Sequence, residues 1–555
     1  MSNYRNIHTK EDIPKLFGFM VITLAKVPII QNMSKFQIGT VPGHRSQEHL
    51  FVMRSMISLY NYYNQPIIVQ LYDIQKFFDR EMLVDGLDAI YNSGVKGKLY
   101  RLLYMMNKNT IIKVKTGVGL TEEENTGENI GQGTGEGAIL SAASIADGVE
   151  TSFKHSGHEI SYGEEDMKPL LFQDDIARMC DSMEAAQYGN DRVTHVMETK
   201  LLDFNLDKSC FMVVGKKNIK KEIMKQKECY PLMLSGYPMK EVVQEKYLGD
   251  YIHSGGNPDS VLATVKARSG ATVAAIIEMK SVLEDTRVNI AGGLKVGIDI
   301  WEISILPFLL NNSEVWADIP KGAIEQLEDL QRMFYRYLFA TPISTPTPAL
   351  LWEAGGWTMH NIIVMFKWTF YHHIVSLEED AVASRVARVA DRAGYPGLVK
   401  EYKTLCQELE LPHPGTMSAF SWKKKVKNAV MKANRSHLLD QIETKYEKLD
   451  FETLKEEKFE LKDYVKTLML HEGRMKFRIR SKMVKYVKLN FSSDPVYSSQ
   501  LWHCTHCDMM DSQSHITKCE SYKYLREGKD LDSDKDLVKY FSDVISLREK
   551  IENLV

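Results

Sequence analysis

Two adjacent aspartates interrupt an apolar segment at residues 170–180, LLFQDDIARMC. Aspartate favours turns, and apolar runs on both sides of a turn are typical of two buried strands in a hairpin. The segment therefore predicts a buried hairpin with Asp174 and Asp175 at its tip. Two ordinary turn residues would give the same pattern, so the pair alone assigns no function.

A third carboxylate, Asp73, ends another predicted strand, QPIIVQLYD at 65–73. Carboxylates that converge from different strands repel one another unless cations lie between them. Mg²⁺ prefers such oxygen ligands and shares the phosphates of a substrate. Asp73, Asp174 and Asp175 therefore predict a two-metal site for in-line phosphoryl displacement. One ion would lower the pKa of the attacking hydroxyl, and the other would stabilise the leaving oxygen.

Length and composition limit the class of protein. A chain of 555 residues is too long for one compact core, so we expect about three or four domains. A composition of 44% hydrophobic and 26% charged residues excludes a disordered or collagen-like chain. The net charge of −3 gives no overall basic character, so any contacts with nucleic acid must be local.

The sequence predicts an intracellular protein with no membrane partner. Its longest apolar stretch, LFGFMVITLAKVPII at 16–30, contains Lys26 and Pro28 and is shorter than a membrane span requires. No convincing signal peptide precedes it. The seven cysteines are an odd number, which without a secretion signal indicates a reducing compartment, the nucleus or the cytoplasm.

The first 250 residues alternate short apolar runs with helical patterns, which indicates an α/β or α+β unit. Within it, residues 85–94 have helical spacing that ends at Gly94, and residues 109–117 are strand-like. From about 258 to 340 the pattern is helical, and residues 340–357 predict a proline-punctuated loop. The remainder, to about residue 490, is helical and highly charged.

The order and content of these segments resemble a reverse transcriptase of the non-LTR retrotransposon type. In sequence order, the segments similar to family motifs are FQIGTVPGHRSQEHL (36–50, fingers), LYDIQKFFD (first catalytic motif), NIGQGTGEGAILS (glutamine-glycine motif), FQDD (aromatic-x-Asp-Asp hairpin), FNLDKSCFM (Asn-x-x-Lys-Ser/Thr motif), KYLGDYI (Tyr-Leu-Gly turn) and ILPFLLNNSEVWA (305–317, thumb). The resemblance runs from residue 3 to about residue 375 and resumes near residue 500. Each motif alone is weak, and the complete set in this order carries the resemblance. Gly131 and Gln173 depart from it, because many relatives have proline and alanine there.

The resemblance implies a right-hand polymerase, an α+β fold with five parts. These are partial fingers (1–60), a palm with the catalytic motifs (61–255), a helical thumb (256–375), a helical basic connector (376–495) and a zinc-knuckle module with a C-terminal helix (496–555). The implied activity is RNA-directed DNA synthesis, in which dNTPs are added to a primer 3′-hydroxyl on an RNA template. Priming would occur on a nicked chromosomal DNA target.

The resemblance also implies roles around the three aspartates. Asp73 and Asp174 would bind two Mg²⁺ ions, with Asp175 in support. Phe78 stands five positions after Asp73, where the family has its steric gate, and its ring would exclude a ribose 2′-hydroxyl. The substrate would therefore be a dNTP. Without the resemblance, Phe78 is an ordinary core phenylalanine.

Four further residues receive roles from the resemblance. Gln132 and Gly133 would lie along the nascent base pair, where a glycine lets the backbone approach closely. Lys208 would protonate the departing pyrophosphate or neutralise its charge. Arg45 would contact the triphosphate from the fingers. Without the resemblance, the glycine run is a flexible loop and the two cations are surface groups.

The C-terminal segment contains the metal-ligand pattern C-x2-C-x7-H-x3-C, formed by Cys504, Cys507, His515 and Cys519. Three thiolates and one imidazole suit tetrahedral Zn²⁺, and four protein ligands leave no open position, so one structural ion is predicted. Unrelated buried cysteines beside a surface histidine are the alternative. The resemblance adds to the zinc interpretation, because many of these retrotransposon proteins carry a Cys-Cys-His-Cys knuckle behind the thumb.

A basic segment at 474–489, RMKFRIRSKMVKYVKL, alternates cations with aromatic rings just before this pattern. Cations bind phosphates and aromatic rings stack on bases, so this segment predicts a binding site for RNA or DNA. The cations assigned to it are Arg474, Lys476, Arg478, Arg480 and Lys482. A solvated amphipathic face is an equally good interpretation. WKKKVKNAVMKANR at 422–435 gives a similar, weaker signal.

Two other functions stay open. An RNA-dependent RNA polymerase shares the palm and both metal motifs, although Phe78 and the thumb and zinc segments argue against it. The second is a catalytically silent, domesticated nucleic-acid-binding protein. It is suggested because SNYRNI at 2–7 resembles the middle of the family's fingers domain, which implies a truncated copy, and no segment resembles the family's endonuclease.

Overall fold

The computed structural model describes residues 12–552 apart from short segments. The segments left out are 109–110, 117–118, 126–128, 132–133, 154–156, 219, 222, 224–230, 286–290, 344, 446–457, 482–483, 485–503, 505–506, 508 and 510–512. Strands lie in the first half of the described chain, and the second half is helical. The α+β class expected from the sequence is therefore confirmed.

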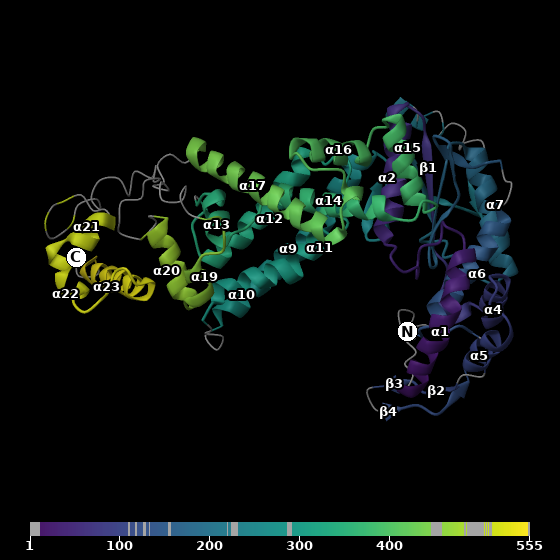
Figure 1. The fold of residues 1–555 in the computed structure, drawn as a ribbon, viewed down its shortest axis with the longest axis horizontal. Helices are drawn as coiled ribbons and strands as arrows, with labels where there is room; N and C mark the ends of the chain where they lie inside the picture. Colours follow the sequence, from purple (N-terminus) through teal and green to yellow (C-terminus); the bar gives the residue numbers. More distant parts are fainter. Residues whose placement is uncertain are drawn as a thin grey trace.

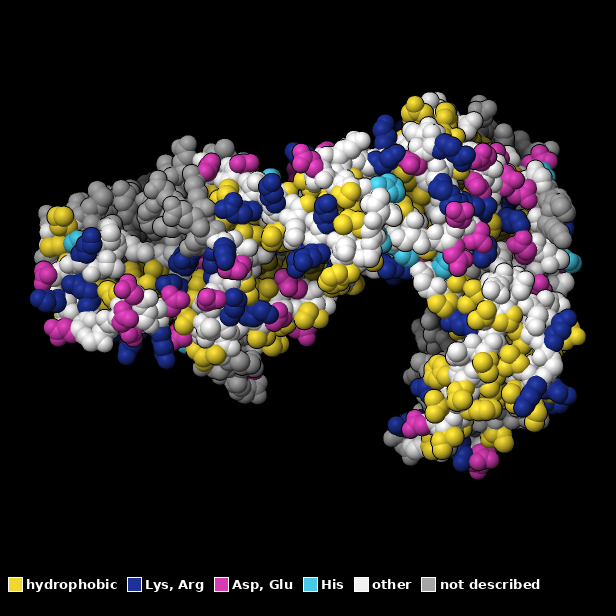
Figure 2. Space-filling view, in the orientation of Figure 1, with side chains coloured by type: hydrophobic (Ala, Val, Ile, Leu, Met, Phe, Trp, Pro, Cys, Tyr) yellow, Lys and Arg dark blue, Asp and Glu magenta, His cyan; other side chains and the backbone are white. Residues whose placement is uncertain are grey.

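The molecule is elongated, with its main sheet at one end and its last helices at the other (Figure 1). The helices between the two ends include α9 (Asn257–Glu284), α12 (Lys321–Phe339) and α17 (Ala419–Lys445). From the sheet end, α1 (Asp12–Asn32) and α5 (Gly97–Asn107) project to one side. The outline is therefore concave between this projection and the central helices (Figures 1 and 2).

A five-stranded sheet of order β13-β10-β1-β9-β8 organises the first half of the chain. Its strands are β1 (Ile67–Tyr72), β8 (Leu170–Phe172), β9 (Asp175–Cys180), β10 (Cys210–Val214) and β13 (Lys240–Glu241). The central strand β1 pairs antiparallel with both β9 and β10. Every residue of β1 is buried. The strand expected at 65–73 and the hairpin expected at 170–180 are confirmed.

The two faces of the sheet belong to two hydrophobic cores. On one face, Ile67, Val69 and Leu71 pack with α2 (Ser46–Tyr62) and with later helices. Those later helices are α14 (Met359–Ser376), α15 (Val382–Ala393), α16 (Leu398–Glu408) and the first part of α17, with the short turn η3 (Pro414–Thr416) between the last two. The predicted domain boundary at 375–376 therefore runs through a single core, because helices on both sides of it cover one sheet face.

The opposite face of the sheet is covered by helices from the first 200 residues. Ile68 and Tyr72 of β1 point into this core. The covering helices are α1, α3 (Phe77–Arg80), α4 (Leu83–Asn92), α5, α6 (Gly137–Ser152) and α7 (Met183–Thr199). The helix expected at 85–94 is confirmed as α4, which ends before Gly94.

Small two-stranded sheets accompany the main one. Their strands are β2 (Ile111–Ile112) with β5 (Glu124–Asn125), β3 (Lys115–Thr116) with β4 (Gly119–Leu120), β6 (Ile160–Tyr162) with β7 (Glu165–Met167), β11 (Met233–Leu234) with β12 (Tyr237–Pro238), and β14 (Gln244–Tyr247) with β15 (Asp250–His253). The single strand expected at 109–117 is only partly right, because β2 and β3 are short and pair with different strands. Ile111 and Val114 are exposed there, so no buried sheet face extends the pairing.

A third core holds the helical second half together. It is built from α9, α10 (Gly293–Ile300), the π-helical turn η1 (Trp301–Ile305), α11 (Leu306–Leu309), α12, α13 (Thr347–Ala354), α19 (Asp463–Thr467), α20 (Leu470–Arg480), α21 (Gln513–Lys518), η5 (Glu520–Tyr522) and α23 (Asp534–Glu552), with α22 (Lys523–Arg526) beside them. The loop expected at 340–357 is wrong in its second part, where α13 forms. Pro348 is tolerated in its first turn, because an N–H there would have no acceptor within the helix.

Two helices, α1 and α9, are long and apolar enough to cross a membrane by length and composition alone. Val261, Val265 and Ile276 of α9 are fully buried in the protein, whereas Leu262, Ile277 and Val282 are exposed. The outer side of α1 exposes apolar side chains such as Ile13 and Leu16, and Figure 2 shows this apolar surface at the projecting end. The absence of a membrane partner stays a prediction.

A buried carboxylate, Asp250 of β15, joins elements from four parts of the chain. Arg54 of α2 donates to its Oδ2 at 2.9 Å, and Arg268 of α9 donates to its Oδ1 at 2.8 Å. The indole N–H of Trp316, just after η2 (Ser313–Val315), donates to Oδ2 at 2.9 Å. The side chains of Asp250 and Arg54 are completely buried. Buried charges are tolerated only when they are paired in this way.

We expect Asp250→Ala to lower the free energy of unfolding by about 3–5 kcal/mol, because it leaves two arginines without their carboxylate. The free energy is measured by urea unfolding followed by tryptophan fluorescence. Asp329→Ala is the control, because Asp329 forms an exposed pair with Arg332 and should cost less than about 1 kcal/mol. Equal losses in the two variants would show that the Asp250 cluster does not join these elements.

Candidate functional site

Asp73 and Asp175 occupy neighbouring positions on two adjacent strands. Tyr72 of β1 is opposite Ile176 of β9, so Asp73 and Asp175 are the next residues along the two chains at this end of the sheet. Leu71 and Ala177 belong to the core on the α2 side, and side-chain alternation places both aspartates on that side. Asp174 lies in the turn between β8 and β9. The fold therefore places Asp73 at the same end of the sheet as the adjacent pair Asp174 and Asp175, which lies about a hundred residues later in the sequence.

The three carboxylates do not form a compact group of metal ligands. Among the described residues, the one group of three or more His, Cys, Asp or Glu side chains that is placed to hold a metal ion is the C-terminal Cys/His group. Carboxylates with no cation between them repel one another. Their oxygens are nevertheless the donors that Mg²⁺ prefers, and both strand ends reach the solvent. The magnesium site stays a prediction that donor type and strand position support.

Lys208 lies beside Asp73, with its Nζ 3.8 Å from Asp73 Oδ2. The turn that carries Lys208 is tied to the end of β1. The N–H of Asn205 donates to the carbonyl of Asp73 at 2.8 Å, and the N–H of Asp73 donates to Ser209 Oγ at 3.0 Å. Sequence reasoning selected Lys208 and missed the anchoring role of Ser209, although the Ser/Thr position of the motif was a usable signal.

Tyr247, at the end of β14, lies in the core on the α2 side of the sheet. Burial, with the charge of Asp175 nearby, raises its pKa well above the ordinary value. Its hydroxyl has no hydrogen-bond partner within the described part of the chain. The Tyr-Leu-Gly turn therefore places a neutral, buried phenol near the aspartates.

Arg45 is exposed at the start of α2, next to a buried carboxylate, Glu48. The N–H of Arg45 donates to Glu48 Oε1 at 2.8 Å. His44 and His373 of α14 also form hydrogen bonds with the Glu48 carboxylate, at 2.7 and 2.8 Å. Burial opposes ionisation of Glu48, but the bonds from His373 and His44 outweigh burial and hold its pKa at about 2. The hydrogen bond that His44 donates to Glu48 raises the pKa of His44 in turn.

Phe78 lies in the short helix α3 and is half-buried at the edge of a core. Its ring centroid is 5.2 Å from that of the buried Phe77, in an edge-to-face arrangement. A partly exposed ring at this position is compatible with a gate and with a core-edge residue. Gln132 and Gly133, expected beside the nascent base pair, lie outside the described residues, as does Lys482.

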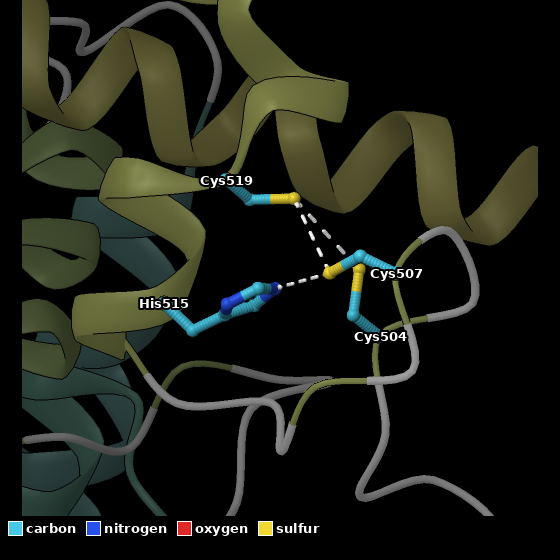
Figure 3. Close-up of side chains that lie close together, drawn as sticks. All are labelled: Cys504, Cys507, His515 and Cys519. Atoms are coloured by element: carbon cyan, nitrogen blue, oxygen red, sulfur yellow. Dashed lines mark hydrogen bonds between the residues drawn. The ribbon is translucent and has the colours of Figure 1, made fainter.

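The C-terminal Cys/His group converges as the sequence pattern predicted (Figure 3). The sulfur of Cys519 is 3.8 Å from that of Cys507 and 4.0 Å from that of Cys504. His515 Nε2 is 3.3 Å from the Cys507 sulfur. A Zn–S bond of about 2.3 Å separates two thiolates of a tetrahedral site by about 3.8 Å. These distances therefore fit the edges of a zinc tetrahedron, and the group can hold a metal such as zinc.

Neighbouring helices support this metal-ligand group. Cys519 follows α21, which carries His515, and its N–H donates to the His515 carbonyl at 2.8 Å. The hydroxyl of Tyr540 on α23 donates to the carbonyl of Ile516 at 2.6 Å. Arg526 donates to the carbonyl of Cys519 at 2.7 Å. The ligand group is thus part of a packed helical unit at the end of the molecule.

Two of the arginines expected to bind nucleic acid cap the end of a helix within the protein. Arg474 of α20 donates to the carbonyls of residues 337 and 338, at 3.1 and 2.8 Å. Arg478 donates to the carbonyl of Ala340 at 2.9 Å. These carbonyls lie at the C-terminal end of α12, where the last carbonyls of a helix lack the usual partner one turn further on. In this state the two side chains hold α20 against α12.

The other two described cations of this segment are also paired within the protein. Arg480 donates to both carboxylate oxygens of the buried Glu353, at 2.8 and 3.0 Å. Lys476 pairs with Asp534 at the start of α23. A structural role for the four cations is therefore visible, and their binding to RNA or DNA stays a prediction.

No protein-family model matches the chain, and no curated protein matches it significantly. Three similar solved structures are telomerases. Telomerase from Candida albicans with a telomeric RNA fragment has a TM-score of 0.35 and 10% identity, over 67% of this chain and 54% of that one. Apo telomerase from Candida tropicalis has a TM-score of 0.33 and 9% identity, over 74% and 61%.

The third telomerase structure, from Candida tropicalis with a telomeric RNA fragment, has a TM-score of 0.31 and 8% identity. It is matched over 76% of this chain and 56% of its own length. The chain thus spans little more than half the length of the telomerase chains that it matches. TM-scores this low are too weak to assign a function.

The Glu48 cluster predicts a pH-dependent contribution to stability. The lowered pKa of Glu48 gives stability that is present above its ordinary value of 4.5 and is lost as the pH falls towards about 2. The raised pKa of His44 gives stability that is complete below 6.5 and is lost as the pH rises through the raised value. Glu48→Gln should therefore cost most near pH 5.5, by about 1.5–3 kcal/mol, and less near pH 9.

Urea unfolding of wild type and Glu48→Gln at both pH values measures this difference. Glu379→Gln is the control, because the Glu379 side chain is exposed on the segment that follows α14. A cost for Glu48→Gln that is the same at both pH values would contradict the ionised cluster.

Replacing both Cys504 and Cys507 with serine should release one equivalent of zinc and unfold the helices from α21 to α23. The metal's binding energy is folding energy in such modules. Metal analysis by mass spectrometry and hydrogen exchange of residues 513–552 measure the two effects. Cys406→Ala is the control, because Cys406 is a buried cysteine outside the group. A wild-type protein that binds no zinc would overturn the assignment.

Proposed function

We propose that this chain is an RNA-directed DNA polymerase of the non-LTR retrotransposon type. The observation that carries the proposal is the pairing of β1 with β9, which makes Asp73 and Asp175 neighbours, with Asp174 in the adjoining turn. Three carboxylates at one end of a sheet, with a lysine beside them, are the groups that two-metal nucleotidyl transfer requires.

The proposed reaction joins a primer 3′-hydroxyl to the α-phosphate of a dNTP and releases pyrophosphate. Two Mg²⁺ ions, when bound, would activate the hydroxyl and compensate the charge of the triphosphate. Asp73 and Asp174 would hold these ions, and Asp175 would support them. Lys208 protonates the leaving pyrophosphate or neutralises it, and its position next to Asp73 supports this role.

Selection of a dNTP is assigned to Phe78. Its ring lies at the edge of the core, five residues after Asp73, where part of it remains accessible to a substrate. Gln132 and Gly133 contact the nascent base pair in this proposal, and Arg45 contacts the triphosphate. The exposed position of Arg45 and the fixed start of α2 support the last assignment.

Contacts with the phosphates of the RNA template and DNA primer are assigned in part to α17. Trp422, Val426 and Val430 of this helix are buried, so the residues between them face the solvent. Four lysines there are exposed and form no ion pair within the described part of the chain: Lys423, Lys424, Lys425 and Lys432. Unpaired cations on one helix suit a phosphate backbone better than the internally paired cations of α20.

The zinc module is proposed to have a structural role. Four protein ligands leave no open position for an activated water. The ion would stabilise the helices from α21 to α23, which lie next to the basic helix α20. Target-primed synthesis and an intracellular location in the nucleus and cytoplasm are part of the same proposal.

A second candidate is a nucleic-acid-binding protein without catalysis. The observation that favours it is that the three aspartates do not form a compact ligand group. The exposed lysines of α17 would serve this function equally well. Measurement of catalysis and binding on the same protein separates the two candidates.

We expect the purified chain to extend a primer on an RNA template with Mg²⁺ and dNTPs, and to use rNTPs poorly. Asp174→Ala should reduce extension by roughly 100-fold or more, because even the outer partners of metal ligands are worth about 10–100-fold. Single-turnover extension on a labelled primer measures both quantities.

Asp207→Ala is the matched control, since Asp207 is an exposed aspartate next to Lys208 and is assigned no ligand role. It should extend at close to the wild-type rate. Equal extension by wild type and Asp174→Ala would show that the hairpin aspartates are not the catalytic ligands. A wild type that binds primer-template but does not extend it would favour the second candidate.

A further inference from the structure

Residues 36–39 form an additional edge beside the hairpin that carries Asp174 and Asp175. The N–H of Leu171 in β8 donates to the carbonyl of Phe36 at 2.9 Å, and the N–H of Ile38 donates to the carbonyl of Leu171 at 3.1 Å. Gln37 is thereby paired in parallel with Leu171, two residues before Gln173 of the turn. The side chain of Gln37 is placed to reach this turn.

The amide of Gln37 binds both backbone groups of Gln173. Its Oε1 accepts from the N–H of Gln173 at 3.0 Å, and its Nε2 donates to the carbonyl of Gln173 at 3.2 Å. The same Oε1 accepts from the N–H of Gly39 at 3.0 Å, and the same Nε2 donates to the carbonyl of Ala142 at 3.5 Å. A primary amide has two donors and two acceptor positions, and all four are used. Gln37 is 1% exposed, so no water competes for them.

Gln173 has a conformation that needs such support. Its φ of 59° lies in the left-handed region, which is unfavourable for a residue with a side chain. It directly precedes Asp174, so its conformation sets the direction in which the chain enters the aspartate pair. Gly39 serves the same contact, because a Cβ there would lie 2.4 Å from the backbone nitrogen of Gln173. Two residues of one segment are thus fitted to a single residue of the turn.

We infer that Gln37 is a positioning residue for the catalytic turn, acting through the backbone of Gln173 on the placement of Asp174 and Asp175. The catalytic consequence of this inference rests on the proposed polymerase function. The hydrogen bonds between the Gln37 amide and the Gln173 backbone, called the clamp below, are a property of the fold. Gln37 touches neither substrate nor metal in this assignment. Its loss should therefore weaken the response to Mg²⁺ more than the binding of dNTP.

The test compares Gln37→Met with Gln70→Met. Gln70 is a matched control because it is also a buried glutamine with a fully bonded side chain, in β1 of the same sheet. Its partners are Ala186 and Asn190 of α7, and Arg178 and the thiol of Cys180 in β9; none of them is a residue of the turn at 173–174. Both variants remove a buried amide, so a purely structural role predicts the same behaviour for both.

The first readout is hydrogen exchange of peptides that contain residues 173–175, which does not depend on catalysis. Gln37→Met should lose protection there, and Gln70→Met should keep it. The second readout is the Mg²⁺ concentration that gives half-maximal primer extension. This Mg²⁺ concentration should rise about 10–100-fold in Gln37→Met, because losing a residue that supports metal ligands has an effect of this size. The KM for dNTP should change little.

Gln37→Glu supplies a rescue by pH and a second variant if the methionine variant does not fold. A protonated carboxyl has one donor and one acceptor and can replace both bonds to Gln173, whereas a carboxylate offers only acceptors to its carbonyl. Activity and turn protection of Gln37→Glu, each relative to wild type, should therefore recover as the pH is lowered. The Gln70→Met ratio should show no such recovery.

Unchanged protection of residues 173–175 in Gln37→Met would overturn the positioning role, whatever the activity. The same holds if the two methionine variants shift the Mg²⁺ response equally. A wild-type protein that does not extend the primer would contradict the proposed polymerase function only. Selective loss of hydrogen-exchange protection at residues 173–175 in Gln37→Met would still establish the clamp.

Discussion

The structure depends on one buried carboxylate, Asp250, and the two arginines that share it. Arg54 comes from the helix that covers the main sheet, and Arg268 comes from the long helix that starts the helical half. The Nε and Nη1 atoms of Arg54 have no hydrogen-bond partner within the described residues, so its Nη2 bond to Asp250 is what stabilises this buried cation. Tyr247, three residues earlier in the chain, borders the candidate catalytic site. The same carboxylate therefore ties the helical half to the helix that covers the sheet.

Much of the sheet and part of the site could be predicted from the sequence. The buried runs on both sides of Asp174 and Asp175 predicted the hairpin, because only a turn accommodates two carboxylates between such runs. Asp73 was predicted to end a strand for the same reason. The metal-ligand spacing of the C-terminal cysteines predicted their convergence, because local spacing sets most of that geometry.

Other features could not be predicted, because they depend on contacts between distant segments. Gln37 is an ordinary polar residue in the sequence, and only its pairing with the hairpin shows that its amide binds Gln173. The arginines of α20 fit a nucleic-acid-binding segment by pattern, and their hydrogen bonds to the carbonyls at the end of α12 could not be predicted from that pattern. Pro348 signalled a loop, yet a proline in a first helical turn is equally consistent with α13.

The C-terminal thiols link the fold of this end of the molecule to oxidation. Cys519 lies at similar distances from Cys504 and Cys507, so it can form a disulfide with either one but not with both. Either disulfide would consume two of the four ligands and leave too few for a bound metal. A bound zinc ion protects the thiolates from this chemistry, because their electrons are engaged at the metal. Oxidative stress would then act on the end of the protein that is farthest from the aspartates, and it would do so without touching the carboxylates themselves.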